Sequence, residues 1–218
     1  MISIEKSKKP KILEQREEEW TQEYVKEFRE SGKVPKNSST RYGHDDIRGT
    51  LSSDSFNKCM YCESNISHIS YPNVEHILPK SEYPDKTYDW DNLGLACQKC
   101  NTTKGTKYDE EVPPIDPYKE KPHDFVYAFG EAYRPLPGND RGKWTIKEIG
   151  LNRSELIEKR ARRLETIQSL AENYARATTD SAKAMFLQEL CIEIKSDREY
   201  VFFAKAMIYG MGITCNDD

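Results

Sequence analysis

Residues 93–104, LGLACQKCNTTK, decide the fold of this chain. A short apolar run leads directly into a C-x-x-C pair, and a polar segment able to begin a helix follows the pair. Such a pair presents two thiolates to one ion from a tight turn, and a second pair, CMYC, lies upstream. Together Cys59, Cys62, Cys97 and Cys100 supply four sulfur ligands, which predicts a tetrahedral structural zinc site.

Other uses of these cysteines explain less of the pattern. A disulfide framework needs an oxidising compartment, and a thioredoxin-like redox motif accounts for one C-x-x-C pair but not for two. The remaining two cysteines stand apart from the pairs. Cys191 falls within an apolar helical pattern and Cys215 lies near the end of the sequence, so we expect both to be free thiols.

The segment between the two pairs predicts a hairpin. Its first apolar run lies in NVEHILPKS (residues 73–81), and its second is the run that enters CQKC. So small a core needs a metal staple to hold itself together. The fold class expected is therefore α+β, a mostly helical chain around a small zinc-stapled ββα-metal module.

Polar groups gather around this hairpin. Glu75 and His76 point to opposite faces if the strand is regular, but a strand end before Pro79 would let both serve one site. Asn101 lies at the start of the predicted helix, and Lys104 follows it. Carboxylate and amide oxygens suit Mg²⁺, and an imidazole near neutral pH suits proton abstraction from water. The combination predicts metal-assisted phosphodiester hydrolysis.

The ordered elements CMYCE, VEHILPKS, DWDNLGLACQKCN and TTKG, over about residues 59–105, resemble the HNH endonuclease family. The resemblance implies that His76 is the general base and that Asn92 braces the loop which orients it. It further implies that Glu75 and Asn101 hold a catalytic Mg²⁺ or Mn²⁺ ion, and that cleavage leaves 5′-phosphate and 3′-hydroxyl ends. Glu75 stands where relatives commonly have Asp. Lys104 is the candidate contact to the substrate phosphate.

A wider resemblance, including PPIDPY and TIKEIGLNRSELIEKR, is to the HNH subunit of Septu-type antiphage defence systems. It implies a partner, an ABC-type ATPase, and a nucleic-acid substrate, with DNA as the default of the HNH class and RNA as the alternative. Two other hypotheses remain open. The chain could be a non-catalytic zinc module that binds nucleic acid or a partner, or an interaction protein whose helices dominate. Only the nuclease hypothesis explains why the three site residue types co-occur.

Four regions follow from the pattern: an N-terminal helical segment (1–56), the HNH nuclease core (57–110), a Pro-rich irregular region (111–150) and a C-terminal helical region (151–218). Helical spacing predicts helices over 10–31, within 44–56, from Asn152 onward, over about 180–195, and from Ser196 to near Gly210. Asn152 and Ser196 each precede a glutamate by three residues, which predicts a capping box.

The composition and charge of the chain limit the kinds of partner that it can bind. Net charge is −4 and the pI is about 5.7, which argues against uniform coating of nucleic acid and indicates that a partner supplies part of the affinity. The basic cluster Lys159, Arg160, Arg162 and Arg163 is the local candidate for a phosphate contact. We find neither a membrane-length apolar run nor the apolar stretch of a signal peptide, so we expect a cytoplasmic protein with no membrane contact.

Overall fold

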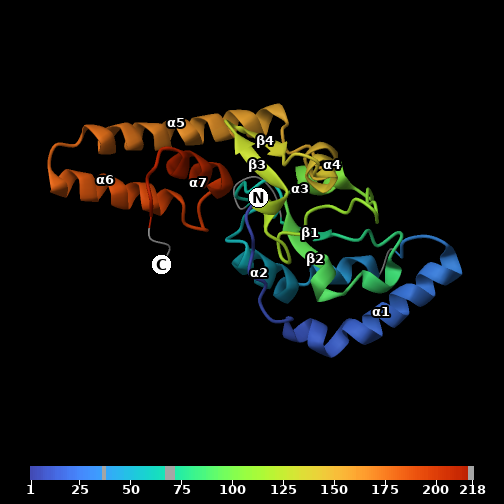
Figure 1. Ribbon diagram of the computed structural model, residues 1–218. Helices are drawn as coiled ribbons and strands as arrows, with labels where there is room; N and C mark the ends of the chain where they lie inside the picture. The colour runs from blue at the N-terminus through green and yellow to red at the C-terminus, as the bar shows by residue number, and fades with distance from the viewer. Residues whose placement is uncertain (36–37, 67–71, 216–218) are drawn as a thin grey trace.

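Helices surround two small antiparallel sheets in the computed structural model of the chain, which describes residues 1–35, 38–66 and 72–215. One sheet pairs β1 (Asn73–His76) with β2 (Leu93–Ala96), and the other pairs β3 (Val126–Phe129) with β4 (Ala132–Pro135). In Figure 1 the first hairpin lies in the middle of the molecule, with α1 below it and β3, β4 and α4 above. The predicted α+β class is confirmed. Residues 67–71, inside the predicted nuclease core, lie outside the described part.

The central hairpin and the helix after it form the predicted ββα unit. The register runs from Asn73 opposite Ala96 to His76 opposite Leu93, one residue against one, so the strand contains no bulge. α3 (Gln98–Lys104) begins inside the second cysteine pair and packs against β1. β1 ends at His76, as the nearby proline predicts.

β2 is buried along its whole length because side chains cover it on both faces. A Cβ atom on Gly94 would lie 2.4 Å from Met60 Sδ and 2.9 Å from Tyr118 Cε2, so only glycine fits at this position. The Tyr118 hydroxyl accepts a hydrogen bond from the Leu95 amide at 3.2 Å. This contact gives the IDPY segment a structural role: it covers the strand that enters the zinc site.

The N-terminal region supports the hairpin from one side. α1 (Lys11–Ser31) matches the prediction and ends at Gly32, whose φ of 63° is the left-handed conformation that glycine adopts without strain. Its buried aromatic residues Trp20 and Tyr24 pack against Tyr88 from the loop between β1 and β2. A 3₁₀ turn, η1 (Ser38–Gly43), and α2 (Asp45–Asp54) follow.

The Pro-rich region is more regular than its composition predicts. Besides β3 and β4 it contains α4 (Asp140–Glu148) and a short 3₁₀ turn at Pro122–Asp124. Two other 3₁₀ turns, Pro84–Lys86 and Trp90–Asn92, lie outside this region, between β1 and β2. Thr145 on α4 is fully buried and accepts the Ile115 amide at 3.0 Å, which anchors the helix to the preceding loop. Prolines therefore punctuate this region without making it irregular.

The C-terminal region is helical, as predicted. α5 (Ser154–Arg176) leads away from the centre of the molecule, α6 (Asp180–Glu193) runs back beside it, and α7 (Val201–Gly210) packs against both (Figure 1). Both predicted capping boxes are wrong, because Asn152 hydrogen-bonds the Tyr133 backbone and the third helix starts only at Val201. No helix in the described ranges has the length and apolar character to cross a membrane.

One cysteine prediction is also wrong. Cys191 on α6 and Cys215 form a disulfide, with their Cα atoms 5.4 Å apart, instead of being free thiols. The two residues are 24 positions apart in sequence, so their pairing depends on the packing of α6 and α7, which a linear pattern does not reveal. The bond ties the segment after α7 back to α6.

Candidate metal centre and active site

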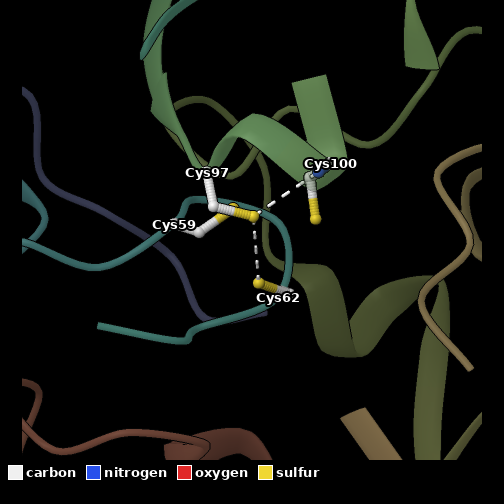
Figure 2. A group of neighbouring side chains, drawn as sticks. All are labelled: Cys59, Cys62, Cys97 and Cys100. Carbon is white, nitrogen blue, oxygen red and sulfur yellow. Dashed lines mark hydrogen bonds between the residues drawn. The ribbon is translucent and has the colours of Figure 1, made fainter. Parts of the chain in front are cut away.

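The four paired cysteines converge as predicted. Their Sγ atoms all lie within 4.8 Å of one another, all four residues are buried, and the Sγ atoms of Cys62 and Cys97 are 3.8 Å apart (Figure 2). A tetrahedral zinc ion with bonds of about 2.3 Å requires sulfur–sulfur separations of about 3.8 Å. The arrangement therefore fits zinc, and Cys59, Cys62, Cys97 and Cys100 would hold it.

Local backbone geometry builds this centre. In the first pair, Glu63 adopts a left-handed φ of 63° and its amide donates to the Cys59 carbonyl, which turns the chain sharply. In the second pair, the Cys100 amide donates to Cys97 Sγ at 3.4 Å at the start of α3. Arg153 Nη1 donates to Cys100 Sγ at 3.5 Å. Burial alone would lower the pKa of this guanidinium, but the neighbouring thiolate raises the pKa above its ordinary value.

The first cysteine pair is also the attachment point of the C-terminal helices. Glu63 accepts the Tyr133 hydroxyl at 3.0 Å and the Phe202 amide at 3.1 Å. Ser64 Oγ lies 2.8 Å from the Tyr200 hydroxyl. These buried contacts connect the zinc centre to α7, and sequence patterns had identified neither Glu63 nor Ser64 as important.

One ring nitrogen of His76 forms a hydrogen bond, and this bond fixes the tautomer of the neutral ring. Its Nε2 lies 2.9 Å from the Thr87 carbonyl oxygen. Since a carbonyl oxygen only accepts, Nε2 must carry the proton, and Nδ1 keeps its lone pair. Burial, followed by the charge of Lys80, lowers the pKa of His76 to about 3. The side chain is 8% exposed, so the imidazole is neutral and nearly enclosed at physiological pH.

Asn92 holds the loop that contacts His76. Its Oδ1 accepts the Leu78 amide at 2.7 Å, and its Nδ2 donates to the carbonyls of Leu78 at 3.0 Å and Lys86 at 2.9 Å. The Lys86 carbonyl belongs to the peptide just before Thr87. By fixing that peptide, Asn92 fixes the acceptor to which the His76 ring is bound.

Glu75 and Lys104 occupy positions that differ from their predicted roles. Lys104 is fully buried, and its Nζ donates to Glu75 Oε1 at 2.7 Å and to the His76 carbonyl at 2.8 Å. An ammonium so enclosed cannot reach a substrate phosphate. Glu75 is 2% exposed and its charge is already balanced, so this arrangement does not present its carboxylate to a divalent cation. Burial raises the pKa of Glu75, against the opposing effect of Lys104.

The two faces of β1 explain this outcome. In a regular strand, adjacent side chains alternate: Glu75 contacts Lys104 and Tyr61, whereas His76 packs against Tyr42. Asn101 lies on α3 one turn before Lys104 and is partly exposed. It remains a candidate oxygen ligand on the helix side of the hairpin.

Comparison with known proteins bears directly on this module. Residues 59–107 match the HNH endonuclease family. The predicted resemblance is thereby confirmed over the ββα unit and the zinc centre, and we call residues 59–107 the HNH segment. It contains the four paired cysteines and Glu75, His76, Asn92, Asn101 and Lys104.

Beyond the HNH segment, the chain is similar to two relatives named Septu protein PtuB. One, from Bacillus thuringiensis, is 32% identical over 79% of this chain and 65% of its own length. The other, from Bacillus mycoides strain KBAB4, is 27% identical over 56% of this chain and 52% of its own length. The chain thus covers less than two thirds of either relative.

Two residues near His76, Tyr42 and Lys80, are part of the site although sequence patterns assign them little or no weight. The ring of Tyr42, from η1, lies perpendicular to the imidazole, with centroids 4.6 Å apart and planes at 87°. Lys80, just after the HNH segment's first strand, places Nζ 2.5 Å from the Tyr42 hydroxyl. Lys80 was visible in the sequence as part of HILPKS, but Tyr42 is remote from that motif and only the tertiary structure reveals it.

The predicted basic cluster on α5 is dispersed. Arg160 is fully buried over the rings of Tyr133 and Phe203, and Arg163 pairs with Glu193. Lys159 instead lines a cavity of about 460 Å³, together with residues of the HNH segment, of the loop before α5 and of the start of α5. This groove, bordering the zinc centre, is lined by Lys99, Arg153, Lys159, Thr102, Gln98, Ser64, Cys97, Leu156 and the single carboxylate of Glu155.

Proposed function

We propose that this chain is an HNH endonuclease that hydrolyses phosphodiester bonds of nucleic acid, with DNA as the favoured substrate. The observation that carries the proposal is the state of His76. Its Nε2–H is committed to the Thr87 carbonyl, which leaves Nδ1 as a neutral base inside an HNH segment. A non-catalytic zinc module would not need a histidine prepared in this way.

In the proposed reaction, His76 Nδ1 removes a proton from water as the water oxygen attacks phosphorus. The P–O3′ bond then breaks, and the leaving 3′ oxygen takes a proton from solvent. The products are 5′-phosphate and 3′-hydroxyl ends. Asn92 acts at a distance, because it holds the Lys86 carbonyl, and the carbonyl of the next residue, Thr87, orients the imidazole.

The resemblance to the HNH family implies a catalytic Mg²⁺ or Mn²⁺ ion, and we include it in the proposal. When bound, the ion would neutralise charge on the scissile phosphate. Asn101 is the oxygen donor that we propose for it. Glu75 does not fit as a ligand while it is buried against Lys104, so a role for this carboxylate requires that the ion pair open. Zinc in the four-cysteine centre is structural, since all four ligands are protein sulfurs.

We further propose that the chain works in the cytoplasm in a Septu-like antiphage complex with an ABC-type ATPase. The relatives named PtuB support the system, and the negative net charge supports a partner that contributes nucleic-acid affinity. The groove lined by Lys99, Arg153 and Lys159 supports a local contact with phosphates beside the HNH segment.

The deciding experiment is cleavage of supercoiled plasmid and of structured RNA with Mg²⁺ or Mn²⁺, with and without the proposed ABC-type ATPase partner. We expect nicking by wild-type protein, none by His76→Ala, and wild-type activity from His123→Ala, which removes an exposed histidine on a distant turn. Equal cleavage by His76→Ala, or no cleavage of either substrate by the partnered wild type, would leave the non-catalytic zinc module as the better account.

A further inference from the structure

We infer that Lys80 is the phosphate-contacting cation of this site and that Tyr42 is the residue that positions it. The inference rests on the proposed function and deepens it. It assigns to Lys80 the role for which the sequence nominated Lys104. It also gives the N-terminal region a part in the site, because η1 supplies Tyr42.

The first observation is that Lys80 lacks a charged partner. Its side chain is half-buried, and within the described ranges no carboxylate lies within 4.0 Å of Nζ. Its polar contact is the Tyr42 hydroxyl at 2.5 Å. A cation partly withdrawn from water and held by a single neutral oxygen retains most of its charge for an incoming anion.

Other sequestered lysines of the chain provide the contrast. Lys104 is neutralised by Glu75. Lys58 donates to the backbone carbonyls of Ser196 and Arg198, and Lys6 donates to those of Trp90 and Leu93. Each of these three ammonium groups is satisfied by two protein oxygens, and each stabilises a packing contact. Lys80 is different because, among the residues that the structure describes, its ammonium donates to one oxygen, the Tyr42 hydroxyl.

The second observation is the location of Lys80 beside the proposed base. Tyr42 contacts Lys80 through its hydroxyl and its ring face, and its ring lies perpendicular to the His76 ring at a centroid distance of 4.6 Å. The ammonium, the phenol and the imidazole therefore form one contiguous group. The charge of Lys80 also lowers the pKa of His76, an effect second only to burial.

These positions define what each residue does. As water attacks, negative charge grows on the non-bridging phosphate oxygens, and the Lys80 ammonium donates hydrogen bonds to them. Burial first, and the same charge second, keep His76 neutral and ready to accept a proton. Tyr42 transfers no proton in this scheme; its hydroxyl holds Nζ on the His76 side of the hairpin, and its ring closes one side of the imidazole pocket.

The variants that test this are Lys80→Met, Lys80→Arg and Tyr42→Phe, with Lys147→Met as the matched control on an exposed part of α4. Zinc content and the unfolding midpoint establish that each variant is folded. We expect Lys80→Met to lower kcat about 100-fold, Lys80→Arg to recover part of that loss, and Tyr42→Phe to lower kcat about tenfold. Lys147→Met should behave as wild type.

Two readouts separate a phosphate contact from a structural role. Removing the positive charge in Lys80→Met should raise the apparent pKa of His76, so the acid limb of the kcat–pH profile, which in the wild type lies below pH 5, should move to higher pH. In buffer without Mg²⁺ or Mn²⁺, the slope of log Kd against log salt for duplex DNA should fall by about 0.9, the loss of one phosphate contact. The control should change neither.

The outcomes are distinguishable. If partnered wild-type protein cuts neither DNA nor RNA, the proposed function fails. If wild type cuts and His76→Ala does not, but Lys80→Met matches Lys147→Met in kcat, pH profile and salt slope, the assignment of Lys80 alone is refuted. If Lys80→Met does not fold, a folded Lys80→Gln protein with the kcat and salt slope of Lys147→Met would overturn it.

Discussion

Replacing Asn92 by aspartate tests the loop brace without changing the shape of the side chain. The Leu78 amide can only donate and the carbonyls of Leu78 and Lys86 can only accept, so the orientation of the Asn92 amide is unambiguous. Asn92→Asp keeps the acceptor for the Leu78 amide. It replaces the Nδ2 group with a carboxylate oxygen about 3 Å from both carbonyl oxygens.

The magnitude follows from the contacts that are lost. Two hydrogen bonds contribute about 1 kcal/mol each, and leaving their carbonyl acceptors facing an oxygen in a site only 4% exposed adds about 1–3 kcal/mol. We therefore expect Asn92→Asp to lower the free energy of unfolding by about 3–5 kcal/mol near pH 7. Cleavage should fall too, because the Thr87 carbonyl that orients His76 is no longer held.

The pH dependence supplies the internal check. Burial against carbonyl oxygens raises the pKa of the introduced carboxyl above its unfolded value, so the folded variant binds more protons than the unfolded chain. Its stability deficit relative to wild type is then largest above the folded pKa and shrinks as pH falls through it, since a protonated carboxyl can donate to one carbonyl.

Urea unfolding of the zinc-loaded proteins between pH 5 and pH 8 measures this. Asn139→Asp is the matched control, because Asn139 caps α4 by accepting the Gly142 amide at 2.8 Å, a role that aspartate keeps. An Asn92→Asp deficit below about 0.5 kcal/mol, or one independent of pH, would refute the hydrogen-bond reasoning.

Four further predictions follow from other contacts. Because the pKa of His76 is lowered to about 3, cleavage rates should show no acid limb from this base between pH 5 and 7; a limb centred near 6.5 would contradict the burial argument. Cys59→Ser should drop the zinc content measured by mass spectrometry from about one per chain and lower the melting temperature, whereas an unchanged content would rule out the four-sulfur site. Lys104→Met leaves a buried carboxylate unpaired, so urea unfolding should show a loss of about 3–5 kcal/mol; a loss under 1 kcal/mol would mean that the ion pair is not formed. Reduction with a phosphine should lower unfolding stability by about 3 kcal/mol through the Cys191–Cys215 bond, and a Cys191→Ala, Cys215→Ala protein should be insensitive to the reductant.

Sequence patterns predicted the parts of the fold whose geometry is local. The hairpin between the cysteine pairs and the end of α1 near Gly32 follow from short-range spacing, whereas α3 begins at Gln98, inside the second pair and before Asn101, where the pattern placed its start. The predicted capping box at Asn152 does not form, because the Asn152 side chain hydrogen-bonds the backbone of Tyr133 instead. The β3–β4 hairpin brings that backbone close to it. At this position a tertiary hydrogen bond outweighs the local preference of asparagine for capping a helix.

By itself the sequence determined the four sulfur ligands and the histidine of the HNH segment, because two C-x-x-C turns and a strand end constrain those side chains within a few residues. Only the tertiary structure decided which charged groups remain available for chemistry. In the described part of the chain, Lys104 is paired with Glu75, whereas the ammonium of Lys80 donates to the hydroxyl of Tyr42 from η1. The physical reason is that the state of a charge depends on its burial and its partner, and both are set by residues distant in the chain.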